Sequence, residues 1–492
     1  MGKKDKKKET ESVKVSKKKE TKKQAKEERK SDNASIIALI IPFLLLIGLA
    51  VLANFVYQDV THIPEMPKLD LNKSWGPRST EPKDTSIRPY RIVFSDSMNS
   101  ELRWLFEVYR RTLRKKSFED TAWTYGVHSD AFAKIFSHWV FKYSFRDRER
   151  FLNQFDQYKT NIQGLDIHYI HVKPKVDKNV MVLPLLLLHG WPGSIREFYE
   201  AIPLLTTVRP GYNFVFEVIA PSLPGFGFSE GAVRPGLSPH QMAIIMRNLM
   251  QRLGHNYYYV QGNDIGHTIG SNMATIFPKE VLGFHSSFPI VPTKRAFLMS
   301  ILGSILPTFV TNWEADRVYP LSDKIMFSLE ESGFLHLQST KPDTIGIALQ
   351  DSPVGLASYI LDRMMLLTDP SNKLDPDGGL DKYFSYDKLL DNIMLYYISG
   401  SITTSLRVFK ETVNDYEVEQ ALAEIPTKVP TWALRLKNSI SYSPDFVLRW
   451  KYPNLVGTTS YNFGGQFIAF ERPEEFAKDV FKAVKAFLDL QK

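Results

Sequence analysis

A short motif, Gly262-Asn263-Asp264-Ile265-Gly266, places a carboxylate between two glycines at a spacing that suits a nucleophile. It follows an apolar run and precedes a helical pattern, so it lies at a strand-to-helix turn. A Gly-x-nucleophile-x-Gly turn needs both glycines because the sharp bend leaves no room for a Cβ atom. A carboxylate raised on such a turn can attack an sp³ carbon and form an ester. The plainer alternative is that Asp264 caps the following helix.

A second motif, His189-Gly190-Trp191-Pro192-Gly193-Ser194, directly follows the apolar run Leu183–Leu188. Glycine and proline force the chain to turn there, so backbone N–H groups can point at a ligand. Alone, the motif fits a plain tight turn equally well. Together with the Asp264 turn, which lies on another strand end about 70 residues later, it indicates an α/β-hydrolase core.

These motifs need a sheet whose strands end at one edge. Apolar runs at Leu183–Leu188, Phe214–Ala220, Tyr257–Gln261 and Val281–Phe288 predict strands, and the helical patterns Gln241–Leu253 and Gly270–Ile276 lie between them. Such alternation predicts a mostly parallel sheet with helices on both faces.

The remaining body divides by its patterning. Helical stretches rich in aromatic residues, such as Ser100–Leu113 and Ser129–Tyr143, predict an arm that packs on another part of the chain. Strand patterns fade after about residue 294, and a long apolar periodicity at Leu389–Phe409 predicts a helical cap. The predicted domains are a disordered Lys-rich tail (1–33), a transmembrane helix (34–57), the arm (58–165), the first part of the core (166–293), the cap (294–428) and the second part of the core (429–492).

The basic character of the chain is confined to its N-terminus. The net charge is +8, and residues 1–33 carry +7 of it, so the nearly neutral body has no positive surface for nucleic acid. The chain has no cysteine, which excludes disulfides, thiolate metal sites and a cysteine nucleophile, and no metal site is predicted.

The uncharged run from Ala34 to Ala53 is long enough to cross a hydrocarbon core of about 30 Å. We predict a single-pass anchor rather than a cleaved signal peptide, because the preceding charged region is long and no cleavage motif stands out. The basic flank favours a cytosolic N-terminus. The sequon Asn72-Lys73-Ser74 would then face the lumen.

From about Trp75 onward the chain resembles the membrane-anchored epoxide hydrolases of the microsomal and juvenile-hormone type. The resemblance implies an α/β-hydrolase that adds water to epoxides of apolar xenobiotics or terpenoid lipids, without a cofactor, at the membrane of the endoplasmic reticulum. The matching motifs are Ser86–Pro89, Gly164–Lys173, His189–Ser194, Pro221–Ser229, Gly262–Gly266, Thr340–Asp343, Asp351–Ala357 and Gly464–Phe467.

The family reaction uses an aspartate nucleophile, two tyrosine proton donors, a histidine base and an acid that orients it. The resemblance implies Asp264 as the nucleophile and the N–H groups of Trp191 and Ile265 as the oxyanion hole. The other family positions fall on Gln466 (base), Ser439 (acid), and Phe409 and Phe334 (tyrosines).

These substitutions remove the proton-transfer groups. An amide does not accept a proton near neutral pH, and phenylalanine keeps the ring of tyrosine without its hydroxyl. No histidine follows His336, so a shifted alignment does not supply the base. We therefore expect a family member with an apolar epoxide or related lipid as its ligand and with impaired catalysis.

Two alternatives stay open. In the first, the site is rearranged and active, with His267 as base, Tyr396 or Tyr397 as proton donor and Asp445 as acid. In the second, the body is a non-catalytic lipid-binding or docking protein. Dehalogenation also needs a base to clear its ester, and Asp264 excludes a serine esterase at this turn.

Overall fold

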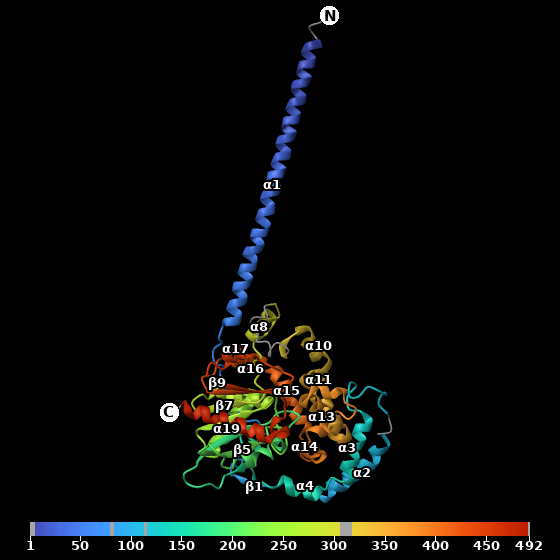
Figure 1. Ribbon diagram of the computed structural model, residues 1–492, viewed down its shortest axis with the longest axis vertical. Helices are drawn as coiled ribbons and strands as arrows, with labels where there is room; N and C mark the ends of the chain where they lie inside the picture. Colours follow the sequence, from blue (N-terminus) through green and yellow to red (C-terminus); the bar gives the residue numbers. More distant parts are fainter. Residues whose placement is uncertain (1–4, 79–82, 113–115, 306–316, 491–492) are drawn as a thin grey trace. The chain divides into compact units, whose positions relative to one another are not determined.

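The computed structural model describes residues 5–78, 83–112, 116–305 and 317–490 (Figure 1). Its contacts divide the chain into two units, Met1–Ile63 and Pro64–Lys492. Residues 1–4 of the predicted tail and 306–316 of the predicted cap lie outside the described residues.

The first unit corrects one expectation. Helix α1 (Asp5–Thr61) is continuous, whereas the sequence predicted a disordered tail up to residue 33. The composition accounts for the helix, because Lys, Glu, Gln and Ala favour helices and the first proline within α1 is Pro42.

Within α1, the segment Ala38–Thr61 is apolar enough to cross a membrane, with a mean hydropathy of 2.7 over 24 residues. At about 1.5 Å per residue it is about 36 Å long, which exceeds the hydrocarbon thickness. It overlaps the predicted span 34–57, and α1 continues past Tyr57 without a break.

The second unit contains one nine-stranded sheet in the order β1-β2-β3-β5-β4-β6-β7-β8-β9. Strands β4 to β9 are mutually parallel, whereas β1, β2 and β3 pair antiparallel and β3 joins β5 antiparallel. The predicted mostly parallel sheet is confirmed. The strands are β1 (Arg88–Tyr90), β2 (Gln157–Ile162), β3 (Leu165–Val172), β4 (Met181–Leu188), β5 (Phe214–Pro221), β6 (Tyr258–Gly262), β7 (Val281–Ser286), β8 (Thr431–Leu436) and β9 (Leu455–Tyr461).

Helices cover both faces of this sheet, as the alternation of side chains on β7 shows. A Cβ atom at Gly283 would lie 2.3 Å from the ring of Phe487 on α19 (Pro473–Asp489). The next residue, Phe284, points to the other face, where its ring lies close to Gly270 on α7 (Ile265–Ile276). The core helices also include η1 (Ile195–Phe198), α5 (Ala201–Leu205), α6 (Pro239–Arg252), α17 (Asp445–Lys451) and α18 (Ile468–Glu471).

A helical cap lies between β7 and β8 in the chain. The long periodicity predicted over Leu389–Phe409 is two helices, because Gly400 has a φ of +64° and ends the first of them. The described cap helices are α8 (Lys294–Ile305), α10 (Leu321–Glu331), α11 (Gly333–Thr340), α12 (Pro342–Asp351), α13 (Pro353–Thr368), η3 (Pro370–Leu374), η4 (Leu380–Lys382), α14 (Tyr386–Ser399), α15 (Ile402–Asn414) and α16 (Tyr416–Glu424).

The arm is part of the same unit as the core. Its helices α2 (Asp96–Thr112), α3 (Ser129–Phe141) and α4 (Phe145–Leu152) lie beside cap helices α13 and α14 (Figure 1). Its strands β1 and β2 extend the sheet, and the predicted boundary at residue 165 falls at the start of β3, within the β2–β3 hairpin.

A buried carboxylate joins arm, cap and core. Asp391 on α14 is fully buried and accepts hydrogen bonds from Arg196 Nε on η1 (2.8 Å), from Arg148 Nε on α4 (2.8 Å) and from the Tyr143 hydroxyl (3.0 Å). Two guanidinium groups share this one carboxylate, so the three parts are held in a fixed relation around the loop that precedes η1.

Candidate active site

Asp264 sits on a strained turn between β6 and α7, as the sequence predicts. Its φ of +52° and ψ of −122° lie outside the regions that non-glycine residues usually adopt. A Cβ atom at Gly262 would lie 2.3 Å from the Gly266 carbonyl oxygen, and one at Gly266 would lie 2.2 Å from the Leu188 carbonyl oxygen. Both glycines are therefore required by close backbone approaches.

The backbone N–H groups of Trp191 and Ile265 address the Asp264 carboxylate. Trp191 N–H donates to Asp264 Oδ2 at 2.8 Å, and burial raises the pKa of Asp264 to about 6 against the opposing effect of these two N–H groups. The carboxyl is thus ionised at neutral pH. These donors lie where the resemblance implies an oxyanion hole.

Aromatic rings from the cap converge on Trp191. Phe334 stacks on its indole with ring centroids 5.5 Å apart, and Phe409 meets it edge-on at 5.7 Å. Tyr359 is a third ring at 6.0 Å, and its hydroxyl accepts a hydrogen bond from Gln338. Two segments about 75 residues apart, α11 and α15, thus bring Phe334 and Phe409 to the same indole.

Gln466 is buried beside the same loop. Its Nε2 donates to the Trp191 carbonyl oxygen at 3.3 Å, and its backbone N–H donates to the Leu367 carbonyl oxygen at 2.8 Å. Behind it, Glu471 accepts from the N–H groups of Gly465 (2.9 Å) and Phe467 (3.0 Å). Burial raises the pKa of Glu471 to about 8, so this carboxyl carries a proton at neutral pH.

Ser439 follows β8 in a loop that lies against the Gln466 segment. The neighbouring Asn438 N–H donates to the Gly464 carbonyl oxygen at 3.0 Å, whereas the Ser439 hydroxyl donates to the Ser441 carbonyl oxygen at 2.9 Å. Arg317 Nη2 donates to the Ser439 carbonyl oxygen at 3.4 Å. The loop is thus next to the Gln466 segment, and the Ser439 side chain is engaged within its own loop.

Known proteins share this architecture. A model of the epoxide hydrolase N terminus matches residues 87–198, and a model of the alpha/beta hydrolase fold matches residues 184–317. Over 430 residues the chain is 47% identical to the juvenile hormone epoxide hydrolase of Bombyx mori, covering 87% of this chain and 93% of that protein. The chain belongs to the epoxide hydrolase family.

Two further comparisons agree. The chain is 38% identical over 441 residues to epoxide hydrolase 1 of Sus scrofa, covering 88% of this chain and 96% of that protein. The crystal structure of juvenile hormone epoxide hydrolase from the silkworm Bombyx mori matches with a TM-score of 0.83 at 46% identity, covering 86% of this chain and all of that chain. The predicted α/β-hydrolase fold is thereby confirmed.

The structure does not bring His267 to the reacting atoms of this epoxide hydrolase family member. Its Nδ1 bonds the Ser286 hydroxyl at 2.7 Å and its Nε2 lies 3.1 Å from the Ile290 carbonyl oxygen, so both ring nitrogens are engaged. Burial lowers the pKa of His267 to about 4. The side chain holds α7 to the segment after β7.

The other residues considered for a rearranged site also have structural partners. Tyr396 is buried, and its hydroxyl donates to the Gly193 carbonyl oxygen at 2.6 Å. Burial, together with the charge of Glu101 on arm helix α2, raises the pKa of Tyr397 to about 12, so this side chain faces the arm. Asp445 forms an ion pair with Arg435.

Two residues that position the loop His189–Ser194, which carries the Trp191 N–H group, were not predicted from the sequence. Asn392 on α14 donates to the Pro192 carbonyl oxygen at 2.8 Å and accepts from the Ser194 hydroxyl at 2.7 Å. Glu197 lies fully buried beneath the loop, and its pKa is raised well above the usual range by burial and by the charge of Asp264. The sequence shows an acidic residue three positions after the motif, which was a signal for Glu197, whereas the helical pattern around Asn392 gives no local signal.

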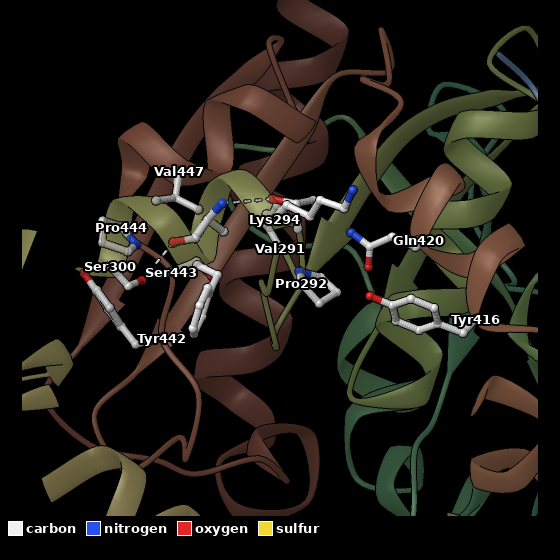
Figure 2. A pocket seen from close by; sticks show the side chains of 13 residues that line it. Val291, Pro292, Lys294, Ser300, Tyr416, Gln420, Tyr442, Ser443, Pro444 and Val447 are labelled. Atoms are coloured by element: carbon white, nitrogen blue, oxygen red, sulfur yellow. Dashed lines mark hydrogen bonds between the residues drawn. The ribbon is translucent and has the colours of Figure 1, made fainter. Parts of the chain in front are cut away.

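Two adjoining cavities lie beside α16, and one of them reaches α7. One, of about 470 Å³, is formed by the start of α8, by Tyr416 and Gln420 of α16, and by the Tyr442–Pro444 loop (Figure 2). A second, of about 200 Å³, shares Tyr416 and Gln420 with it and reaches His267 and Lys451. Asp264, Trp191 and Gln466 line neither cavity, so among the described residues these spaces are distinct from the candidate site.

Proposed function

We propose that this protein is a membrane-anchored member of the epoxide hydrolase family that captures lipophilic epoxides on Asp264 and resolves the resulting ester slowly. The observation that carries the proposal is the contrast within one site. The nucleophile is presented with its two backbone donors, whereas the position beside the loop holds Gln466, whose amide donates to Trp191.

The first half of the family chemistry is supported by the environment of Asp264. A carboxylate oxygen of Asp264 attacks an epoxide carbon, the carbon–oxygen bond of the ring breaks, and the ring oxygen takes a proton. With a pKa of about 6, the carboxyl is ionised at neutral pH, yet it is more basic than an ordinary aspartate. Both properties favour nucleophilic attack.

We assign the proton for the epoxide oxygen to Tyr359. It is the phenol among the three rings that contact the Trp191 indole, since the other two are Phe334 and Phe409. Its hydroxyl accepts from Gln338, which leaves the hydroxyl hydrogen for another acceptor. We expect Tyr359→Phe to slow ester formation by about 10²-fold, and Tyr397→Phe, which faces the arm, to leave it unchanged.

The second half of the chemistry lacks support. Hydrolysis of the ester needs a base that removes a proton from water, and such help contributes about 10²–10⁴-fold. Gln466 has no basic nitrogen, and both ring nitrogens of His267 are occupied by structural partners. The ester therefore persists.

The ligand class follows from the ring cluster and from the relatives. Trp191, Phe334 and Phe409 form an aromatic wall that suits an apolar molecule. Similar proteins are named juvenile hormone epoxide hydrolases, so a terpenoid epoxide is the ligand that we propose for this chain.

We also propose that Ala38–Thr61 anchors the protein in the membrane of the endoplasmic reticulum with its N-terminus in the cytosol. Asn72 is exposed, so a luminal body would be open to glycosylation there. A glycosidase-sensitive mass shift that disappears in Asn72→Gln is expected, and an unglycosylated chain with a protease-accessible body on the cytosolic side contradicts this orientation.

The central experiment measures intact mass and diol in one tube. The detergent-solubilised chain is mixed with an excess of a stilbene-type or terpenoid epoxide. We expect an adduct of epoxide mass that persists after excess ligand is removed and that is absent from Asp264→Ala. Diol in many-fold excess over protein, without adduct, overturns the proposal in favour of an active hydrolase. Neither adduct nor diol from folded protein overturns it in favour of a binding or docking module.

A further inference from the structure

Two histidines and a glutamate from three segments meet on the sheet, away from the turn that carries Asp264. They are His171 on β3, Glu217 on β5 and His255 just before β6, and their ligand atoms all lie within 4.8 Å of one another. In the part of the chain that the structure describes, no other group of three His, Asp or Glu side chains is this close.

The strand register places the first two on one face. His171 pairs with Ile219 across the antiparallel β3–β5 ladder, and Glu217 lies two residues before Ile219, so both side chains leave the same face. In the parallel ladders Glu217 pairs with Pro184, whereas Leu188 at the end of that strand pairs with Gly262. Glu217 therefore lies four residues along the strands from the end that carries Asp264.

The contacts leave one imidazole incompletely used. His171 Nε2 lies 2.7 Å from Glu217 Oε1, and His255 Nε2 lies 3.4 Å from the same oxygen. The His255 Nε2 atom is buried and has no hydrogen-bond partner in the described structure. A plain His171–Glu217 hydrogen bond accounts for two of the three residues and leaves this nitrogen unexplained.

We propose that His171, Glu217 and His255 form a zinc-binding site. Two imidazole nitrogens and one carboxylate oxygen are the donors that Zn²⁺ accepts in tetrahedral sites, with water as the fourth ligand. Mg²⁺ and Ca²⁺ prefer sites built from oxygen.

Modest side-chain movement suffices to complete the geometry. Ligand atoms of a tetrahedral zinc ion lie about 3.3 Å apart, so the His171 ring must withdraw from Glu217 by about half an ångström. The two imidazole nitrogens, which lie within 4.8 Å of each other, must come to the same separation. The two rings are already inclined at 79°. The side chains are 11%, 14% and 14% exposed, which leaves an approach for the ion and for one water.

The surrounding charges fit a divalent cation. Glu217 supplies a carboxylate that both imidazoles face, with nitrogen–oxygen distances of 2.7 Å and 3.4 Å. Lys173 Nζ lies 3.8 Å from Glu217, but its side chain is 73% exposed and can turn into solvent when the ion binds. The ion would tie β3, a strand of the antiparallel part of the sheet, to β5 and to the segment before β6.

The test titrates untagged, chelator-treated full-length chain in detergent with Zn²⁺ against a chromophoric chelator, and with Co²⁺ followed by its visible absorption. We expect one equivalent of bound metal, tetrahedral-type Co²⁺ bands and a higher unfolding midpoint with Zn²⁺. His255→Gln should lose at least tenfold in affinity and show no zinc-dependent rise. His138→Gln serves as the matched control, because His138 pairs with a single carboxylate, Asp387.

The proposal is overturned if folded wild-type chain binds no Zn²⁺ in the micromolar range, or if His255→Gln binds it as tightly as the wild type. The readouts are independent of epoxide chemistry, so the zinc site stands or fails separately from the proposed capture of epoxides.

Discussion

Replacing Gln466 by histidine should accelerate hydrolysis of the Asp264 ester. Gln466 is 2% exposed and its amide lies 3.3 Å from the Trp191 carbonyl oxygen, on the loop that donates to Asp264. An imidazole there is close enough to act on a water at the ester carbon. Because its side chain has about the volume of the glutamine, the change should leave the fold intact.

The size of the rate increase depends on whether a carboxylate orients the new imidazole. A positioned base contributes about 10²–10⁴-fold. The Ser439 hydroxyl points to Ser441 and offers the new ring no carboxylate. Gln466→His alone should therefore give the lower value, about 10²-fold, or about 2.7 kcal/mol of barrier. Adding Ser439→Glu, whose carboxylate would lie near the guanidinium of Arg317, should raise the gain toward about 10⁴-fold.

The assay isolates the second chemical step. Protein is loaded with epoxide, freed of excess ligand, and followed by intact mass as the adduct disappears and diol appears. Gln466→Asn is the control, since it changes size without supplying a base, and it should decay at the wild-type rate. The reasoning is refuted if Gln466→His and Gln466→Asn lose their adducts at the same rate while both melt like the wild type.

Three further outcomes are expected. Only the ionised form of Asp264 attacks, and its pKa is about 6. The initial rate of adduct formation should therefore be constant above about pH 7 and fall about tenfold per pH unit below about pH 6. A constant rate down to about pH 5 contradicts that pKa. Asp391→Asn leaves the buried Arg196 without its full counter-charge and should lower the free energy of unfolding by about 3–5 kcal/mol in urea titrations; a loss below about 1 kcal/mol contradicts the role of this ion cluster. Lys451→Met removes the buried ammonium that donates to Thr275 and to two backbone carbonyl oxygens, and should cost about 2–3 kcal/mol by the same measurement, with Lys478→Met on the surface as the neutral control.

The turn Gly262–Gly266 could be predicted from the sequence because its requirements are local. Two glycines, one acidic residue and an apolar run before them specify a strained strand-to-helix turn, and the structure shows the backbone contacts that require Gly262 and Gly266. The parallel strands were predictable for a similar reason, since strands buried on both faces are continuously apolar.

The residues around the turn Gly262–Gly266 could not be predicted in the same way. Asn392 reaches the oxyanion loop from a helix about 200 residues later, and nothing in its local pattern distinguishes it from other helical polar residues. The proposed zinc ligands His171, Glu217 and His255 are far apart in the sequence and form no motif. The fold brings them together, and the β3–β5 register places the first two on one face. The low hydrophobicity of the Lys-rich tail predicts disorder, whereas the helix propensity of its Lys, Glu, Gln and Ala residues agrees with the helix in the structure.

A two-step mechanism explains why a site without its base would still present a nucleophile. Ring opening needs the Asp264 carboxylate and a proton donor, whereas ester hydrolysis needs a base, and the two sets of groups occupy different segments of the chain. Under the proposed function, the N–H groups of Trp191 and Ile265 serve both steps. They donate hydrogen bonds to the carboxylate before attack and polarise the ester carbonyl afterwards. Loss of the base therefore does not return the site to an inert pocket. Under the proposed function, each Asp264 site should consume one epoxide molecule, and further consumption should follow only at the rate at which water hydrolyses the ester without a base.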